Sequence, residues 1–188
     1  MMQKTNYFTN HFLIAMPTLM DPNFFHSVTF ICEHNEHGAM GIVINQPVDL
    51  ILGDLAEQLH FETTDEVALL QPIYRGGPVD NERGFVLHRP LGKWESTLDI
   101  TDDIGISTSN DIVSALAAGR GPRDSLIALG YAGWGAGQLE QELADNAWLS
   151  GPADARIIFE TRAEQRWVEA ARLLGIDINS MSGDVGHA

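Results

Sequence analysis

The chain is poor in cysteine, in lysine and in long apolar runs. Its 188 residues contain one cysteine, Cys32, and two lysines, Lys4 and Lys93. A single cysteine excludes an internal disulfide and a cysteine-rich zinc site. It also favours a reducing compartment, so we expect a cytoplasmic protein. No stretch approaches the roughly 20 apolar residues that cross a bilayer as a helix, so we expect no membrane partner.

Positive charge is scarce throughout the sequence. Eleven basic residues face 26 acidic ones, which gives a formal net charge of −15. Affinity for nucleic acid depends on neutralising phosphates, so we expect no direct nucleic-acid binding. An acidic surface instead suits a basic protein partner. Hydrophobic residues make up 44% of the chain, which is enough to form a core at this length.

The patterning indicates one α+β domain over residues 1–180 and a flexible tail over 181–188. Runs rich in β-formers or continuously apolar predict strands at 11–15, 27–33, 40–45, 73–75, 85–88, 94–100 and 126–129. Apolar residues at helical spacing predict helices at 53–59, from about 109 to 119, at 136–145 and from about 161 to 175. Strands come first and helices are interspersed later, which is typical of a mixed α+β fold.

A glycine-rich stretch, Gly130–Gly137, lies between an apolar strand and a helix. This layout is typical of loops that bind phosphate at a helix N-terminus. The spacing excludes that use, because Gln138 stands where the dinucleotide fingerprint needs glycine. Glu140 and Glu142 also occupy the first helical turn, where a phosphate would meet carboxylates. We expect the stretch to serve close backbone packing or a site for a neutral group.

A small basic island precedes that stretch. Between residues 74 and 93, four basic residues and two acidic ones give a local charge of +2. If the strands on either side of Gly76-Gly77-Pro78 pair, Arg75 comes within one or two rungs of His88. Arginine binds carboxylate or phosphate through two parallel bonds, so this island is a candidate anion site. The candidate ligand-binding residues are Arg75, Gly76, Gly77, His88, Arg89, Gly133, Trp134 and Gly135. The alternative is that the arginines pair with surface acids and that Trp134 is a core residue.

Two sets of residues could hold a metal ion. Cys32, His34 and His37 are potential zinc ligands, but no fourth ligand is apparent. Asp99, Asp102 and Asp103 lack the spacing of a calcium loop, so a solvated acidic turn fits them better. We expect no metal site and no cofactor.

Several motifs together resemble the YqgE/AlgH family of bacterial proteins. The resemblance extends from Phe12 to Leu174 and rests on Phe12–Pro17, Asp21–Phe24, Gly38–Pro47, Gly76–Val79, Phe85–His88, Gly130–Trp134 and Gly137–Glu140. It implies a cytoplasmic α+β domain with a mixed, mostly antiparallel, barrel-like sheet flanked by helices. It supplies no catalytic residues. One branch carries a name tied to alginate production and, with it, the label of a transcriptional regulator.

These observations favour a non-enzymatic binding, adaptor or regulatory protein that holds a basic protein partner or an anionic small molecule. The alternative is a hydrolase that acts on an anionic small molecule at the basic island, with His88 as the candidate general base. A third hypothesis is a transcriptional regulator that acts indirectly, without touching DNA. The sequence leaves the oligomeric state open.

Overall fold

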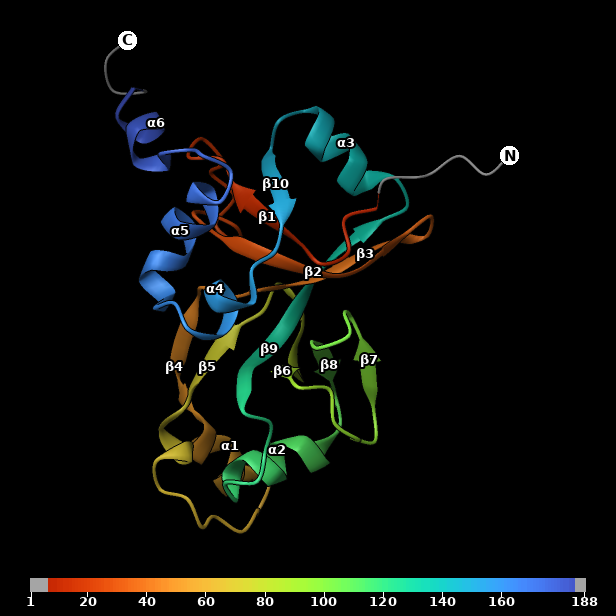
Figure 1. Ribbon diagram of the computed structural model, residues 1–188, viewed down its shortest axis with the longest axis vertical. Coiled ribbons are helices and arrows are strands. Elements are labelled where there is room, and N and C mark those ends of the chain that lie inside the picture. The colour runs from red at the N-terminus through yellow and green to blue at the C-terminus, as the bar shows by residue number, and fades with distance from the viewer. Residues whose placement is uncertain (1–6, 185–188) are drawn as a thin grey trace.

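The computed structural model describes residues 7–184 (Figure 1). In this part the chain forms ten strands: β1 (His11–Ala15), β2 (Val28–Asn35), β3 (Gly38–Val43), β4 (Pro47–Ile51), β5 (Pro72–Arg75), β6 (Val79–Arg89), β7 (Thr97–Asp99), β8 (Gly105–Ser107), β9 (Asp124–Gly135) and β10 (Trp148–Pro152). It also forms α1 (Leu52–Gln58), α2 (Asn110–Ala117), α3 (Gln138–Ala144), α4 (Ala155–Phe159), α5 (Arg166–Arg172), α6 (Ile178–Asp184) and two 3₁₀ turns, η1 (Ala68–Leu70) and η2 (Ala163–Gln165).

The strands join in one curled sheet with the main order β10-β1-β2-β3-β9-β6-β8-β7. All neighbouring pairs are antiparallel except β5 and β9, which run parallel. Helices flank the sheet on several sides (Figure 1). The expected α+β fold, with a mixed and mostly antiparallel sheet, is therefore confirmed.

The twelve-residue strand β9 runs through the centre of the sheet and changes partner halfway. Its first half pairs with β5, from Ile127 to Leu129, and its second half pairs with β3. Gly130 lies at the change with a φ of +79°, a backbone conformation that favours glycine. The glycine-rich stretch is thus strand from Gly130 to Gly135, and the expectation of a loop is wrong for these residues.

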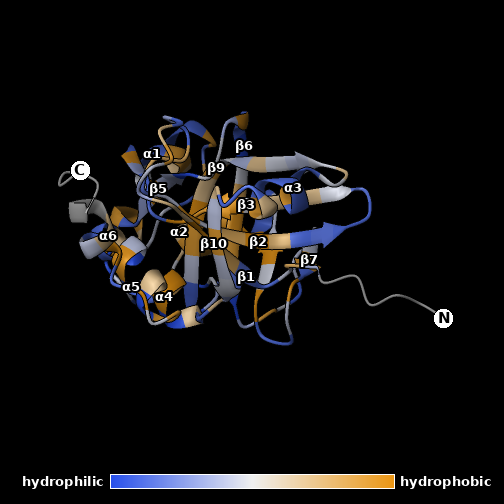
Figure 2. Ribbon diagram, turned by 90° about the horizontal axis from the view of Figure 1, so that it is seen from above, coloured by the Kyte–Doolittle hydropathy of each residue, from blue (hydrophilic) through white to orange (hydrophobic). Residues whose placement is uncertain are grey.

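The core consists of three hydrophobic clusters on different sides of the sheet. Along β1, Phe12 and Ile14 face the first cluster, while Leu13 and Ala15 face the second. Helices α4, α5 and α6 cover the first cluster, α3 covers the second, and α1 and α2 surround the third. Both faces of β1 are buried, which explains why its sequence is continuously apolar. Figure 2 shows the hydrophobic residues gathered in the central strands.

The expected pairing of the strands around Gly76-Gly77-Pro78 is wrong. Strand β9 lies between β5 and β6, so Arg75 is opposite Leu129 and His88 is opposite Ser125. The two glycines instead let the connection cross β9 at close range. A Cβ atom at Gly76 would lie 2.3 Å from the carbonyl oxygen of Gly130, and one at Gly77 would lie 2.1 Å from the carbonyl carbon of Tyr131.

The end of the chain differs from a simple tail. Helix α6 continues across residue 181, where the flexible tail was expected to begin. Residues 185–188 of that expected tail lie outside the described residues. Among the helices of residues 7–184, none is long and apolar enough to cross a membrane.

Candidate functional site: an open groove on the sheet

A groove of about 650 Å³ lies on the side of the sheet where β2, β3, β6 and β9 meet. It is bordered by residues of all four strands and of the β2–β3 turn: Glu33, Asn35, His37, Gly38, Ala39, Met40, Val79, Arg83, Phe85, Tyr131, Gly133 and Trp134. Two of the candidate residues from the sequence, Gly133 and Trp134, are among them. We call this hollow the Gly133 groove.

The floor of the Gly133 groove is bare: it lacks a side chain at position 133, because that residue is glycine. Gly133 is exposed and lies opposite Met40 of β3. Its φ is not positive, and an added Cβ would find its nearest neighbour, a ring carbon of Tyr131, at an ordinary contact distance of 3.4 Å. Neither packing nor backbone conformation therefore requires glycine at this position. A larger residue would fit the strand but would fill the groove.

Apolar side chains with charges at the rim surround this floor. The guanidinium carbon of Arg83 lies 5.3 Å from the centre of the Phe85 ring, which itself packs edge-on against Tyr131. Met40, Arg83 and Phe85 also border a second hollow of about 260 Å³ that extends toward β7 and β8. The two hollows together form a continuous surface along the sheet, with Glu33 and Arg83 as charged neighbours.

The residues behind the floor are structural. Trp134 is 7% exposed, packs in the second core cluster and donates its indole N–H to Glu142 Oε1 at 3.1 Å. Trp148 donates to the same oxygen at 3.0 Å. The alternative interpretation of Trp134 as a core residue therefore matches its position, although the residue also borders the groove.

The neighbouring carboxylate of α3 also has a specific partner. Glu140 accepts a hydrogen bond of 2.6 Å from Nε2 of the buried His34. The Phe8 backbone N–H donates to Nδ1 of the same ring, which leaves Nε2 as the nitrogen that carries the proton. His34 and Glu140 thus join β2 to α3.

His88 is fully buried and has a partner at each ring nitrogen. Nδ1 donates to the Pro90 carbonyl oxygen at 3.0 Å, and Nε2 lies 2.8 Å from the Ser107 hydroxyl. Burial lowers the pKa of His88, although the bond to Pro90 and the charge of Asp99 oppose this shift. This enclosed, satisfied position leaves no side of the ring open to a substrate.

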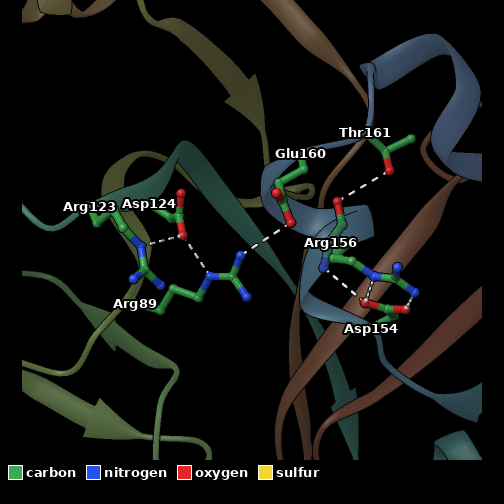
Figure 3. Close-up of polar contacts among 7 residues, drawn as sticks. All are labelled: Arg89, Arg123, Asp124, Asp154, Arg156, Glu160 and Thr161. Carbon is green, nitrogen blue, oxygen red and sulfur yellow. Dashed lines mark hydrogen bonds and ion pairs between the residues drawn. The ribbon is translucent and has the colours of Figure 1, made fainter.

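Arg75 and Arg89 of the expected basic island lie at different positions along β9, opposite Leu129 and Asp124. Arg75 donates to Asn23 Oδ1 at 2.8 Å. Arg89 pairs with Asp124 at 2.6 Å and with Glu160 at 3.3 Å, as Figure 3 shows. The alternative interpretation, that these arginines pair with acids, holds for Arg89. Gly135 does not border the groove, and an added Cβ there would find its nearest neighbour, Gln138 Oε1, at an ordinary contact distance of 3.9 Å.

The potential metal ligands do not converge. Cys32 is buried in the first core cluster, and burial raises the pKa of its thiol above the ordinary value. His34 faces Tyr7 and Phe8 instead, at ring-centre distances of 5.1 and 5.7 Å. Within residues 7–184 no group of three or more His, Cys, Asp or Glu side chains is placed to hold a metal ion.

The sequence did not single out the side chains that define the groove. Met40 and Phe85 are ordinary strand residues in the sequence, and Arg83 is only one of the four basic residues counted between 74 and 93. The available signal was period-two alternation along β9, where Tyr131, Gly133 and Gly135 share one face. Interpreting Gly130–Gly137 as a loop concealed this alternation.

The fold and groove define a class: a single α+β domain with one curled sheet and an uncovered sheet face. A family model described as AlgH-like matches residues 12–179, and the chain belongs to this family. A UPF0301 protein of Thioalkalivibrio sulfidiphilus is 57% identical over 187 residues, which cover 100% of both chains. A UPF0301 protein of Nitrosococcus oceani is 54% identical over 97% of each chain.

Two solved structures share the fold. The solution structure of the AlgH protein from Pseudomonas aeruginosa is 49% identical, covers 97% of each chain and superposes with a TM-score of 0.80. A crystal structure of a Corynebacterium diphtheriae protein superposes with a TM-score of 0.73 over 92% of this chain and 90% of that chain. At 18% identity, the second likeness concerns the fold alone.

Proposed function

We propose that this protein is a non-enzymatic binding protein that holds an extended segment of a basic protein partner in the Gly133 groove. The observation that carries the proposal is the bare floor: glycine occupies a strand position where a side chain would fit without strain. A strand that omits a side chain there, at some cost in stability, leaves room for another molecule.

The composition of the groove supports a protein segment as the ligand. Met40, Phe85 and Tyr131 offer apolar surface beside the bare floor. Aromatic residues and methionine are enriched where proteins bind one another. Two adjoining hollows suit an extended chain with side chains in successive positions, as when a peptide lies along a sheet.

The charge of the whole chain supports a basic partner over an anionic one. The groove lining itself is balanced, with one acid, Glu33, and one arginine, Arg83. The whole chain carries −15. Such a field attracts a basic segment and speeds its association.

A regulatory role would then act through a protein partner and not through DNA. The same acidity opposes phosphate contacts. We also assign the protein to the cytoplasm, because its one cysteine is a buried thiol and has no disulfide partner in this sequence. The hydrolase alternative finds no support at His88, whose ring is enclosed.

The proposal is tested by selecting binding segments from a random peptide library displayed on phage, with the full chain as bait. Peptides are then measured against Gly133→Leu and against Gly135→Leu, a matched change two residues further along β9 and outside the groove lining. We expect selected peptides to be basic and extended. We expect Gly133→Leu to weaken them at least about tenfold, with a melting temperature within about 2–4 °C of wild type.

The Gly135→Leu control distinguishes a blocked groove from a destabilised protein. Gly135→Leu should leave the affinity within about twofold, since added Cβ atoms at both glycines find their nearest neighbours at ordinary contact distances. Equal binding by wild type and Gly133→Leu would remove the groove as the binding site. A selection that yields only acidic peptides would contradict the assigned charge of the partner.

A further inference from the structure

A separate pocket, distinct from the Gly133 groove and from the hollow of about 260 Å³ next to it, is bordered by a buried arginine that has no acidic partner within residues 7–184. Arg166, the first residue of α5, is 6% exposed. Its Nε donates to the Thr161 carbonyl oxygen at 2.9 Å, and its Nη1 donates to the Ile44 carbonyl oxygen. Its guanidinium carbon also lies 5.1 Å from the centre of the Tyr74 ring.

No carboxylate of residues 7–184 forms an ion pair with Arg166. An arginine stays charged in proteins, so it cannot escape burial by losing a proton. A buried charge is normally compensated by an opposite charge, because carbonyl dipoles and a ring offset only part of the desolvation. Nη2 makes no hydrogen bond to the described chain, which leaves a charged donor available.

Arg166 also borders a pocket of about 330 Å³ between β5, β9, α4 and α5. The pocket also presents Arg123, Ser125 and Gln71 as polar neighbours and Tyr74, Ile158 and Phe159 as apolar ones. Its volume lies at the lower end of the range for small-molecule sites, which is about 300–1,000 Å³. The combination of a polar end and an apolar wall suits a small organic anion.

We propose that this pocket binds the carboxylate or phosphate group of a small molecule, with Arg166 and Arg123 as its two cationic contacts. Arg166 supplies a fixed donor from the interior. The side chain of Arg123 is 70% exposed and bonds Asp124 through Nε alone, at 3.3 Å, so its terminal nitrogens remain available at the pocket mouth. Guanidinium groups bind both oxyanions well, so the two chemistries share one site.

Asp124 also borders the pocket, but its charge is already compensated. Arg89 and Arg123 both bond its Oδ2 (Figure 3). Burial opposes ionisation of Asp124, and the hydrogen bonds from the two arginines outweigh this effect, so its pKa lies below the ordinary value. Around the pocket, the arginines are Arg89, Arg123 and Arg166, and the acids are Asp124 and Glu160. The local charge is therefore +1, in a chain whose net charge is −15.

The test uses the full chain and two probes, inorganic phosphate and succinate, each titrated at constant ionic strength against chloride. Binding is followed by calorimetry and by the NMR signals of the arginine side chains. We expect at least one probe to saturate and to shift the Arg166 Nε–H signal. Saturation by phosphate alone assigns a phosphate ligand, and saturation by succinate alone assigns a carboxylate ligand.

Variants connect the binding to the pocket. Arg123→Gln, on an exposed side chain, should fold normally and weaken binding about tenfold. Arg120→Gln removes the same charge from an exposed position outside the pocket and should change affinity less than about twofold. Arg166→Lys keeps the charge but loses the fork geometry, and we expect it to weaken binding by a similar factor if it folds.

Absence of saturation by both probes would overturn the inference, as would equal weakening by Arg120→Gln and Arg123→Gln. Neither result bears on the Gly133 groove, because peptide binding there is measured separately and involves none of these arginines. Conversely, peptide measurements that contradict binding in the Gly133 groove do not affect the test of the pocket.

Discussion

The two faces of the second half of β9 are built from alternate residues of one strand and have opposite characters. Ala132 and Trp134 point into a closed cluster covered by α3. Tyr131 and Gly133, their immediate neighbours, border the open groove. The face that carries Trp134 is closely packed, and the Trp134 indole N–H has a hydrogen-bond partner. The face that carries Gly133 lacks a side chain at a position where one would fit.

This contrast separates glycines that the fold requires from glycines that it tolerates. Gly38, directly opposite Gly135, has a φ of +138°, and its Cβ would lie 2.2 Å from the Trp134 carbonyl oxygen. Gly133, two residues before Gly135 on the paired strand, has neither constraint. A glycine without a structural reason is the stronger indicator of binding.

The largest expected effect lies on the closed face. Trp134→Ala removes a buried indole and leaves a cavity in the second cluster, so we expect a loss of about 3–5 kcal/mol in the free energy of unfolding. Denaturant unfolding followed by far-UV circular dichroism measures it. Trp134→Phe, which keeps a ring, should lose less, and a loss under about 1 kcal/mol for Trp134→Ala would show that this face is not closed.

An intermediate effect is expected from protons at the enclosed His88. Its pKa is lowered by burial in the folded chain, while the unfolded chain has the ordinary value near 6.5. Below about pH 6.5 the unfolded state therefore binds more protons, and stability falls as the pH falls. His26, whose pKa is also lowered by burial, contributes with the same sign.

The measurement compares the pH dependence of the unfolding free energy in wild type and in His88→Asn. One such group contributes at most about 1.4 kcal/mol per pH unit, and the variant should show a shallower slope below pH 6.5. The slope is independent of the fixed cost of the substitution itself. An unchanged slope would contradict the enclosed position of His88.

The smallest effect is expected on the open face. Gly133→Ala should change stability by less than about 0.5–1 kcal/mol, and in the stabilising direction, because alanine restricts the unfolded chain without strain in the strand. Gly38→Ala is the contrast, and its clash with the Trp134 carbonyl should destabilise the protein clearly. Thermal melts of the two variants side by side test the distinction, which fails if both glycines behave alike.

Local pattern was sufficient to predict most of the elements. Strands β1, β2 and β3 and helices α1, α2 and α3 lie where apolar spacing and turn residues indicated them. Strand β4 was not predicted, because Pro47 indicates the end of a strand. Proline is nevertheless tolerated at the first residue of an edge strand, and β4 is an edge strand that begins at Pro47. Strands β8 and β10 are short and carry glycine, so their local signal is weak.

Long-range pairing is where prediction from sequence failed. Nothing near Arg75 or His88 in the sequence shows that a strand more than 35 residues later inserts between them. The candidate anion site depended on that pairing and loses its geometry without it. Arg166 was missed for the same reason, since its burial against Ile44 and Tyr74 arises only when α5 packs onto distant strands.

Trp134 and Trp148, which share one carboxylate as hydrogen-bond acceptor, can serve as intrinsic fluorescent reporters. Two of the four tryptophans donate to Glu142 Oε1, and one of them, Trp134, borders the groove and packs in the second core cluster. Indole emission responds to the field and hydration around the ring. Intrinsic fluorescence therefore reports from immediately beneath the surface where a partner would lie, without any label attached to that surface.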